Sequence, residues 1–216
     1  MKKLTIALLK TEAKAFGKAE TAHHESTLFG VTDGKAVGTY FEHKFQRHLH
    51  TKYSYVEGSS AKGIDFPGIS VDMKVTSIKQ PQSSCPFKTA RQKVYGLGYS
   101  LIIFVYEKTD NGRKKTGNLK ILHTIFVDSS RTADFQTTSG LRRIVENSGN
   151  TDDVMAFIEE RNLPVDDIQA HALAEEIVAA PPEVGFLTIS NALQWRLQYS
   201  RVIEQAGKIN GVQRIV

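Results

Sequence analysis

The spacing of apolar residues predicts two helices in the first fifty positions. Residues 4–24 have the pattern of one helix. A second helix is expected to begin at Thr32 or Asp33, which are both suitable N-cap residues, and to end near His50. Its apolar residues recur every four positions and therefore share one face: Val37, Phe41, Phe45 and Leu49. Glu42 lies beside this face.

The pattern changes to a period of two after Ile64. From Ile69 to Thr76 the odd positions are apolar and the even positions are polar, which is typical of a strand with one buried face. Side chains two residues apart in a strand lie on the same face, so we expect Asp72 and Lys74 to project together.

The rest of the chain continues with both kinds of element. A basic helix is expected over 86–96, and strands are expected over 99–106 and 119–127 with a polar turn over 109–118 between them. Further helices are expected near 138–147, 151–161, 166–179 and 190–206. This order predicts an α/β fold, in which a mixed central sheet is flanked by helices and followed by a helical C-terminal extension.

The C-terminal third begins with an acidic stretch. Residues 151–183 hold nine acidic residues and Arg161 as the one base, so this stretch should face away from any polyanionic partner or toward another subunit. The segment 191–201 is basic and amphipathic as a helix, and we expect its apolar residues in the core: Leu193, Trp195 and Leu197. A dimer contact or an arm of a helix-turn-helix is the alternative for this helix.

We divide the chain into a core with N-terminal helices (1–130) and a helical part packed on it (131–216).

The composition is that of a globular protein. With 40% hydrophobic and 24% charged residues, the chain of 216 residues can bury a core, which excludes a disordered tail, a collagen-like fibre and a coiled coil. The single cysteine, Cys85, cannot form an internal disulfide, which favours the cytoplasm. The first apolar run ends at Leu9, so we expect no export signal, and no stretch reaches the roughly 18 apolar residues of a membrane span.

The positive charge is concentrated in the first part of the chain. Residues 1–120 hold 20 Lys and Arg against 10 Asp and Glu, whereas residues 121–216 hold 8 against 13. The two parts therefore carry net charges of +10 and −5. A basic half favours a polyanionic partner such as nucleic acid, because lysines over phosphates release condensed counterions.

The candidate chemistry lies between Gly63 and Lys74. Asp65 precedes the predicted strand across a Pro-Gly turn, and Asp72 and Lys74 share one face of that strand. Two carboxylates that converge at strand ends can hold Mg²⁺, and a neighbouring ammonium can position a water and stabilise charge on a phosphate. Such a site would hydrolyse a phosphodiester bond. The alternative is an exposed strand face on which these charges pair with one another.

These residues resemble the PD-(D/E)xK nuclease superfamily, and within it the type II restriction endonucleases, over roughly residues 35–127. By this resemblance Asp65, Asp72 and the Met73 carbonyl would bind Mg²⁺, with Mn²⁺ as a possible substitute, and Lys74 would orient the attacking water. Glu42 would match the helix glutamate that some members use at a metal; an exposed glutamate paired with lysines is its alternative. Ile64 stands where the signature proline is expected, and Pro67 comes later.

A polar, basic segment without acidic residues follows the predicted strand, from Thr76 to Lys93. Its polar side chains are expected to line the DNA cleft, some on phosphates and others on base edges: Lys79, Gln80, Gln82, Ser83, Ser84, Lys88, Arg91 and Lys93. The alternative is a solvated loop and helix face. The run 113–115 would contact backbone phosphate or simply form a charged hairpin tip.

The resemblance implies a Mg²⁺-dependent type II restriction endonuclease that cuts double-stranded DNA at a specific, palindromic site. A homodimer and a cognate DNA methyltransferase are the expected partners. A repair or junction-resolving nuclease of the same superfamily, or a non-catalytic DNA-binding regulator, is the alternative. Zinc spacing, the G-x-S-x-G motif of serine hydrolases and a Walker loop are all absent from the sequence.

Overall fold

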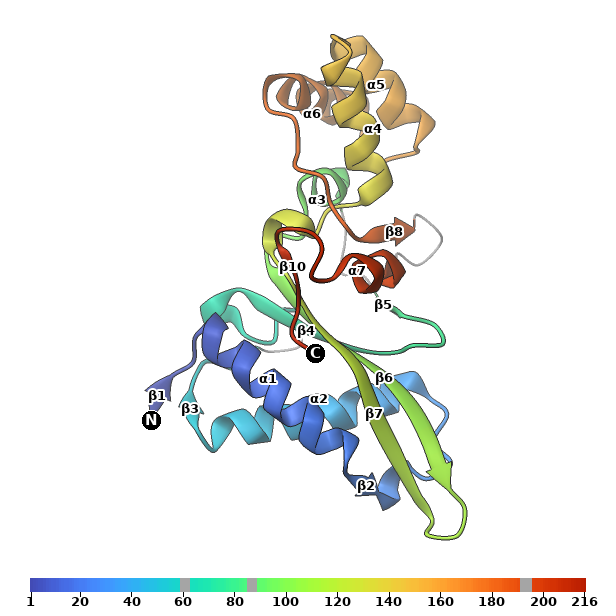
Figure 1. Cartoon of the computed structure of the whole chain (residues 1–216). Coiled ribbons are helices and arrows are strands. Elements are labelled where there is room, and N and C mark those ends of the chain that lie inside the picture. The colour runs from blue at the N-terminus through green and yellow to red at the C-terminus, as the bar shows by residue number, and fades with distance from the viewer. Residues whose placement is uncertain (59–62, 85–88, 191–195) are drawn as a thin grey trace. The chain divides into compact units, whose positions relative to one another are not determined.

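A computed structural model describes residues 1–58, 63–84, 89–190 and 196–216. The chain forms two compact units (Figure 1). Unit 1 comprises Met1–Ser83, Leu101–Val127 and Gln205–Val216, and unit 2 comprises Ser84–Ser100 and Asp128–Glu204. Four residues discussed above lie outside the described residues: Cys85, Lys88, Leu193 and Trp195.

Unit 1 is built on a five-stranded sheet. Four strands follow the order β10-β7-β6-β4, and β2 also pairs with β7. Its strands are β2 (His24–Glu25), β4 (Val71–Ser77), β6 (Ser100–Asn111), β7 (Thr116–Val127) and β10 (Val212–Arg214). β6 and β7 form a long antiparallel hairpin in which Leu101 lies opposite Val127. The short strands β1 (Lys2–Lys3) and β3 (Tyr53–Ser54) pair in parallel, and β5 (Gln82–Ser84) follows β4.

Two helices, α1 (Ile6–Thr21) and α2 (Gly34–His50), pack against β7 and β4 respectively. Asp33 caps α2 as predicted, because its carboxylate accepts hydrogen bonds from the first-turn N–H groups. The four apolar residues at four-residue spacing are all fully buried. Phe41 and Phe45 pack against Phe104 of β6 with ring centroids 4.7 and 5.3 Å away. This aromatic core fixes α2 over β4, the strand that carries the candidate site.

Unit 2 is mainly helical. Its helices are α3 (Ala90–Tyr95), α4 (Phe135–Glu146), α5 (Thr151–Glu160), α6 (Asp167–Ala179) and α7 (Ser200–Gln205), and its strands are β8 (Thr188–Ser190) and β9 (Arg196–Gln198). The apolar faces of α3 to α6 share one core, which includes Val94, Leu141, Val154 and Ile177. In the described parts of the chain, no helix is both long and apolar enough to cross a membrane.

The predicted fold class is confirmed: a central mixed sheet is flanked by helices. The predicted helix over 190–206 is wrong, because Arg196–Gln198 is a strand paired with β8 and α7 begins only at Ser200. Leu197 and Tyr199 alternate with polar residues and are fully buried. This alternation is the pattern of a strand, and the segment forms a strand although its apolar residues also fit one face of a helix. The predicted turn over 109–118 is also too long, since the β6–β7 pairing continues to Asn111 opposite Thr116.

Candidate active site

Asp72 and Lys74 lie on one face of β4, as their spacing predicts. Asp72 Oδ2 and Lys74 Nζ are 2.7 Å apart, and the two side chains are 3% and 20% exposed. The predicted alternative, a solvated strand face, is therefore wrong. Asp72 and Thr76, which lie on the same face as Lys74, are both buried. A buried ion pair on this face is costly in the absence of a binding role.

A tight turn brings Asp65 back to the start of β4. The chain forms a 3₁₀ turn over Pro67–Ile69, and Ser70 takes a left-handed conformation with φ of 52°. The backbones of Phe66 and Val71 then pair through two hydrogen bonds of 2.9 and 3.3 Å. Ile69 thus belongs to the turn and not to the strand, which begins two residues later than predicted. Beyond this closed turn, the Met73 N–H donates to Asp65 Oδ2 over 2.8 Å.

Glu42 reaches the same site from α2. Its neighbour Phe41 is held in the core, so Glu42 lies at the edge of the face that packs on β4. Burial raises the pKa of Glu42, and the negative charge of Asp65 raises it further, whereas Lys74 and His43 lower it. These interactions place Glu42, Asp65, Asp72 and Lys74 within electrostatic reach of one another.

The cluster holds three carboxyl groups and one amine. Burial raises the pKa of Asp72 to about 7, the charge of Lys74 opposes this shift, and a hydrogen bond and repulsion from Asp65 add to it. Burial alone would lower the pKa of Lys74, but Asp72, Asp65 and Glu42 together raise it. A cation bound beside these three carboxyl groups would favour their charged forms and so lower their pKa values.

The donor set fits a hard divalent cation. Asp72 Oδ2 is buried, and its described contact is the Lys74 ammonium 2.7 Å away. Within the described ranges, no three carboxylate, imidazole or thiol groups lie close enough to enclose an ion by themselves. Mg²⁺ does not require three such protein groups, because it keeps several waters and binds through one or two carboxylates. Asp65, Asp72 and the Met73 carbonyl are the groups that could hold it.

The residues predicted to contact DNA divide between the units. Lys79, Gln80, Gln82 and Ser83 belong to unit 1, in the segment that leaves β4, whereas Ser84, Arg91 and Lys93 belong to unit 2. Lys79 and Gln80 are exposed. Arg91 forms a bidentate ion pair with Glu176. Lys93 is only 6% exposed, and burial lowers its pKa against the influence of Asp134. Burial leaves Lys93 without the exposed face that the predicted DNA contact requires.

Tyr55 and Gly58 adjoin the site, and sequence patterns did not reveal them. The Gly58 N–H donates to the Asp65 carbonyl over 2.9 Å. A Cβ at Gly58 would lie 1.7 Å from the Ile64 carbonyl oxygen, so only glycine allows this approach. Burial and the charges of Glu57 and Asp65 raise the pKa of Tyr55. A lone glycine in a polar stretch gives no signal of such a contact.

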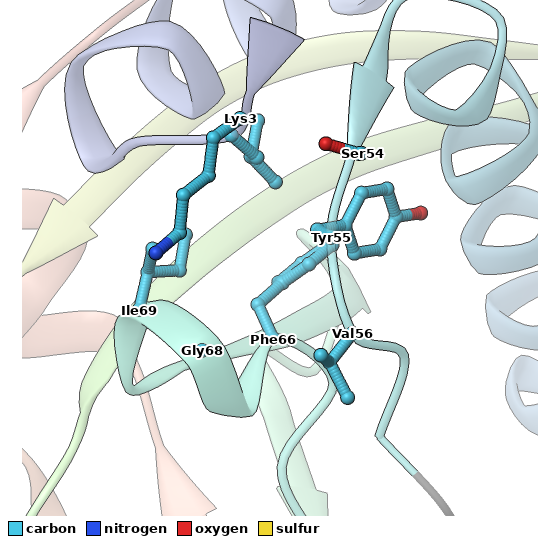
Figure 2. A pocket seen from close by; sticks show the side chains of 8 residues that line it. Lys3, Ser54, Tyr55, Val56, Phe66, Gly68 and Ile69 are labelled. Carbon is cyan, nitrogen blue, oxygen red and sulfur yellow. The ribbon is translucent and has the colours of Figure 1, made fainter. Parts of the chain in front are cut away.

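An apolar cavity lies on the other side of the Asp65 turn. It has a volume of about 440 Å³, and Figure 2 shows the side chains that line it: Lys3, Leu4, Ser54, Tyr55, Val56, Phe66, Gly68 and Ile69. The Tyr55 and Phe66 rings contact each other with centroids 5.5 Å apart. Phe66 and Ile69 therefore link this cavity to the turn that positions Asp65.

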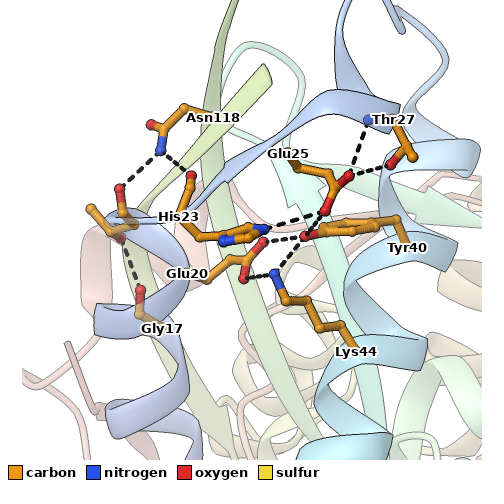
Figure 3. Close-up of polar contacts among 9 residues, drawn as sticks. Gly17, Glu20, His23, Glu25, Thr27, Tyr40, Lys44 and Asn118 are labelled. Atoms are coloured by element: carbon orange, nitrogen blue, oxygen red, sulfur yellow. Dashed lines mark hydrogen bonds and ion pairs between the residues drawn. The ribbon is translucent and has the colours of Figure 1, made fainter. Parts of the chain in front are cut away.

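A polar network around the buried Glu20 joins α1 to α2 (Figure 3). The Tyr40 hydroxyl donates to Glu20 over 2.9 Å and lies 3.4 Å from Glu25, and Lys44 Nζ contacts Tyr40 at 2.6 Å and Glu20 at 2.8 Å. Burial and the two glutamates raise the pKa of Tyr40. Since Lys44 and Tyr40 flank Glu42 along α2, the network helps to fix the helix that carries this glutamate.

Comparison with known proteins decides the family. The family model described as "Type II restriction enzyme NspV" matches residues 3–214, which is nearly the whole chain. The chain belongs to the NspV family of type II restriction enzymes. Type II restriction enzyme NspV from Nostoc sp. (strain ATCC 29411 / PCC 7524) is 63% identical to it over 209 residues, which cover 97% of this chain and 95% of that protein. No solved structure matches the chain.

Membership of the NspV family confirms the resemblance to type II restriction endonucleases. The match spans both units, so the helical unit 2 is part of the NspV family architecture as much as the sheet of unit 1.

Proposed function

We propose that this protein is a Mg²⁺-dependent type II restriction endonuclease that hydrolyses phosphodiester bonds of double-stranded DNA at a specific, palindromic site. The observation that carries the proposal is the cluster of Asp65, Asp72 and Lys74, because it combines a cation-binding donor set with a buried ammonium. The similarity to a type II restriction enzyme supports DNA as the substrate.

The metal site consists of Asp65, Asp72 and the Met73 carbonyl. When bound, Mg²⁺ lowers the pKa of a water molecule and neutralises charge on the scissile phosphate; Mn²⁺ could substitute. The turn over Pro67–Ile69 holds the two aspartates together before the ion arrives, so the site requires little rearrangement.

Lys74 orients the attacking water and stabilises the charge that develops on the phosphate. Its pKa is raised by Asp72, Asp65 and Glu42, so it stays protonated at neutral pH and acts as a hydrogen-bond donor and a positive charge. Asp72 keeps the ammonium in place through the 2.7 Å ion pair. Glu42 lies within electrostatic reach of Asp65 and Lys74, where it would take up a proton or contact a metal-bound water.

A homodimer is the proposed active form. One such site cuts one strand, so a double-strand cut at a palindrome requires two sites related by a two-fold axis. A cognate methyltransferase acting on the same sequence in the cytoplasm would protect the host DNA. The proposed DNA contacts in unit 1 are polar residues of the segment that leaves β4: the exposed Lys79 and Gln80 and the half-buried Gln82 and Ser83. Ser84 and Arg91 are the proposed contacts in unit 2.

Digestion of plasmid DNA tests the proposal. We expect a reproducible set of discrete bands with Mg²⁺, intact plasmid with EDTA, and restored bands when Mg²⁺ is added in excess. A smear would indicate a nonspecific nuclease, and intact plasmids of varied sequence bound by the protein would indicate the regulator. Either of these results would reject a restriction endonuclease.

A further inference from the structure

β6 and β7 continue well beyond the end of β4 as a two-stranded arm (Figure 1). Directly after the end of β4, the Ile78 N–H donates to the Tyr106 carbonyl of β6 over 2.9 Å. The hairpin then remains paired to Asn111 opposite Thr116. At about 3.3 Å per strand residue, the paired part of the arm extends about 17 Å past this contact.

The arm is braced on one side. Asn118 Nδ2 donates to the carbonyls of Thr21 and His23 over 3.0 and 2.7 Å, and β2 pairs with β7 at this point (Figure 3). Gly117 lies so close to Leu28 that a Cβ there would be 2.8 Å from the leucine Cβ. These contacts hold the arm in a fixed direction within unit 1.

The tip of the arm has a defined conformation. Asn111 Oδ1 accepts hydrogen bonds from the N–H groups of Arg113 and Lys114 over 3.1 and 3.0 Å, which closes the turn. Lys115 takes a left-handed φ of 53°, and its Nζ lies 4.9 Å from the centroid of the Phe29 ring. The backbone that carries these cations is therefore ordered before any partner binds, which reduces the entropic cost of binding.

The positive charge of the tip is not compensated within the arm. Asp110 forms an ion pair with Lys108, and Glu107 lies opposite Lys120 across the hairpin. The arm carries no other acidic residue, and the described residues supply no ion-pair partner for its three exposed tip cations: Arg113, Lys114 and Lys115. Unit 1 as a whole holds 19 Lys and Arg against 10 Asp and Glu.

We propose that Arg113, Lys114 and Lys115 bind backbone phosphates of the DNA substrate to one side of the cleavage site. The inference rests on the proposed function. A tip without apolar side chains offers a protein partner little surface to bury, whereas a duplex presents a phosphate charge every 1.7 Å or so along its axis. Contacts to phosphate carry no sequence information, so the arm contributes affinity and register, and the recognition sequence is read elsewhere.

The test is the salt dependence of binding to a fluorescent duplex several helical turns long, measured by anisotropy in EDTA between about 50 and 200 mM salt. The variant is Arg113→Gln/Lys114→Gln/Lys115→Gln. The matched control, Lys14→Gln/Lys18→Gln/Lys208→Gln, removes three exposed cations elsewhere in unit 1. Each lost phosphate contact should reduce the slope of log K against log salt by about 0.9, so the tip variant should lose up to about 2.7 per subunit.

At 0.1 M salt this loss corresponds to weakening of up to about 500-fold, equal for every duplex sequence. The control should keep the wild-type slope, and the tip variant should still produce the wild-type band pattern from plasmid at low salt. A tip variant with wild-type slope and affinity would overturn the role of the arm while leaving the proposed function intact. A wild-type protein that binds no duplex would overturn both.

Discussion

Asp72 carries its charge in surroundings that oppose it. The residue is 2% exposed, and its pKa is raised to about 7, first by burial. The single positive charge of Lys74 cannot balance the charges of Asp72, Asp65 and Glu42 when all three carboxyl groups are ionised. An arrangement of this kind destabilises the metal-free fold and is suited to a bound cation.

The pH dependence of stability should therefore depend on Asp72. An unfolded chain releases this proton near pH 4, whereas the folded chain releases it near pH 7. Between these values the folded state holds more protons, so the free energy of unfolding should fall as pH rises, by at most about 1.4 kcal/mol per pH unit for this group. Asp72→Asn should flatten this slope in metal-free urea titrations, and Asp152→Asn, at an exposed site on α5, should keep it. Identical slopes in wild type and Asp72→Asn would contradict the assignment.

The shared strand face of Asp72 and Lys74 could be predicted from the sequence, but their burial could not. Alternation places both on one face, and this prediction is confirmed. The pattern alone also allowed a solvated face, since polar residues on a strand usually face water. Their surroundings include the Asp65 turn and Glu42 of α2, a helix some thirty residues earlier in the chain, and no local pattern encodes these contacts.

At the scale of elements, a turn and a glycine position the site. The 3₁₀ turn over Pro67–Ile69 brings Asp65 beside Met73, and Gly58 lies against the backbone that precedes Asp65. The helix spacing of α2 and the alternation of β4 were visible in the sequence because each repeats over several residues. The predicted helix over 190–206 failed because its amphipathic pattern also fits a hairpin strand, in which Leu197 is buried.

Gly58→Ala should impair cleavage more than folding. The new Cβ would meet the Ile64 carbonyl oxygen at 1.7 Å, so the backbone before Asp65 must shift, and a displacement of about 1 Å can reduce the cleavage rate roughly 100-fold. Gly68→Ala is the matched control, because a Cβ there has no atom within 4 Å. Rates would be measured on plasmid with Mg²⁺, and circular dichroism would check the fold. Equal rates for the two variants would show that Gly58 does not position Asp65.

At the scale of the molecule, the excess of positive charge and the candidate active-site residues belong to the same unit. Unit 1 contains the acidic cluster, the basic arm and a net charge of +9, whereas unit 2 has 9 Lys and Arg against 13 Asp and Glu. The sequence revealed this asymmetry and the fold class, but it could not show which strands are neighbours. The order β10-β7-β6-β4 depends on pairings between residues that are far apart in the chain.

A two-fold assembly predicts how a mixed dimer behaves. If each subunit cuts one strand, a dimer of one wild-type chain and one Lys74→Ala chain should convert supercoiled plasmid to the open circle and stop there. Differently tagged chains purified in two steps would supply this species. The wild-type dimer should give linear products under the same conditions. Linear products from the mixed dimer would contradict the assignment of one strand to each subunit.

The most direct measurement is single-turnover cleavage of a duplex that carries the site mapped from plasmid digests, with binding measured in parallel. The cluster of Asp65, Asp72 and Lys74 predicts that Lys74→Ala reduces the cleavage rate at least about 100-fold while the duplex is still bound, and that Lys14→Ala on α1 cleaves like wild type. Cleavage by Lys74→Ala at the wild-type rate would contradict the active site described above.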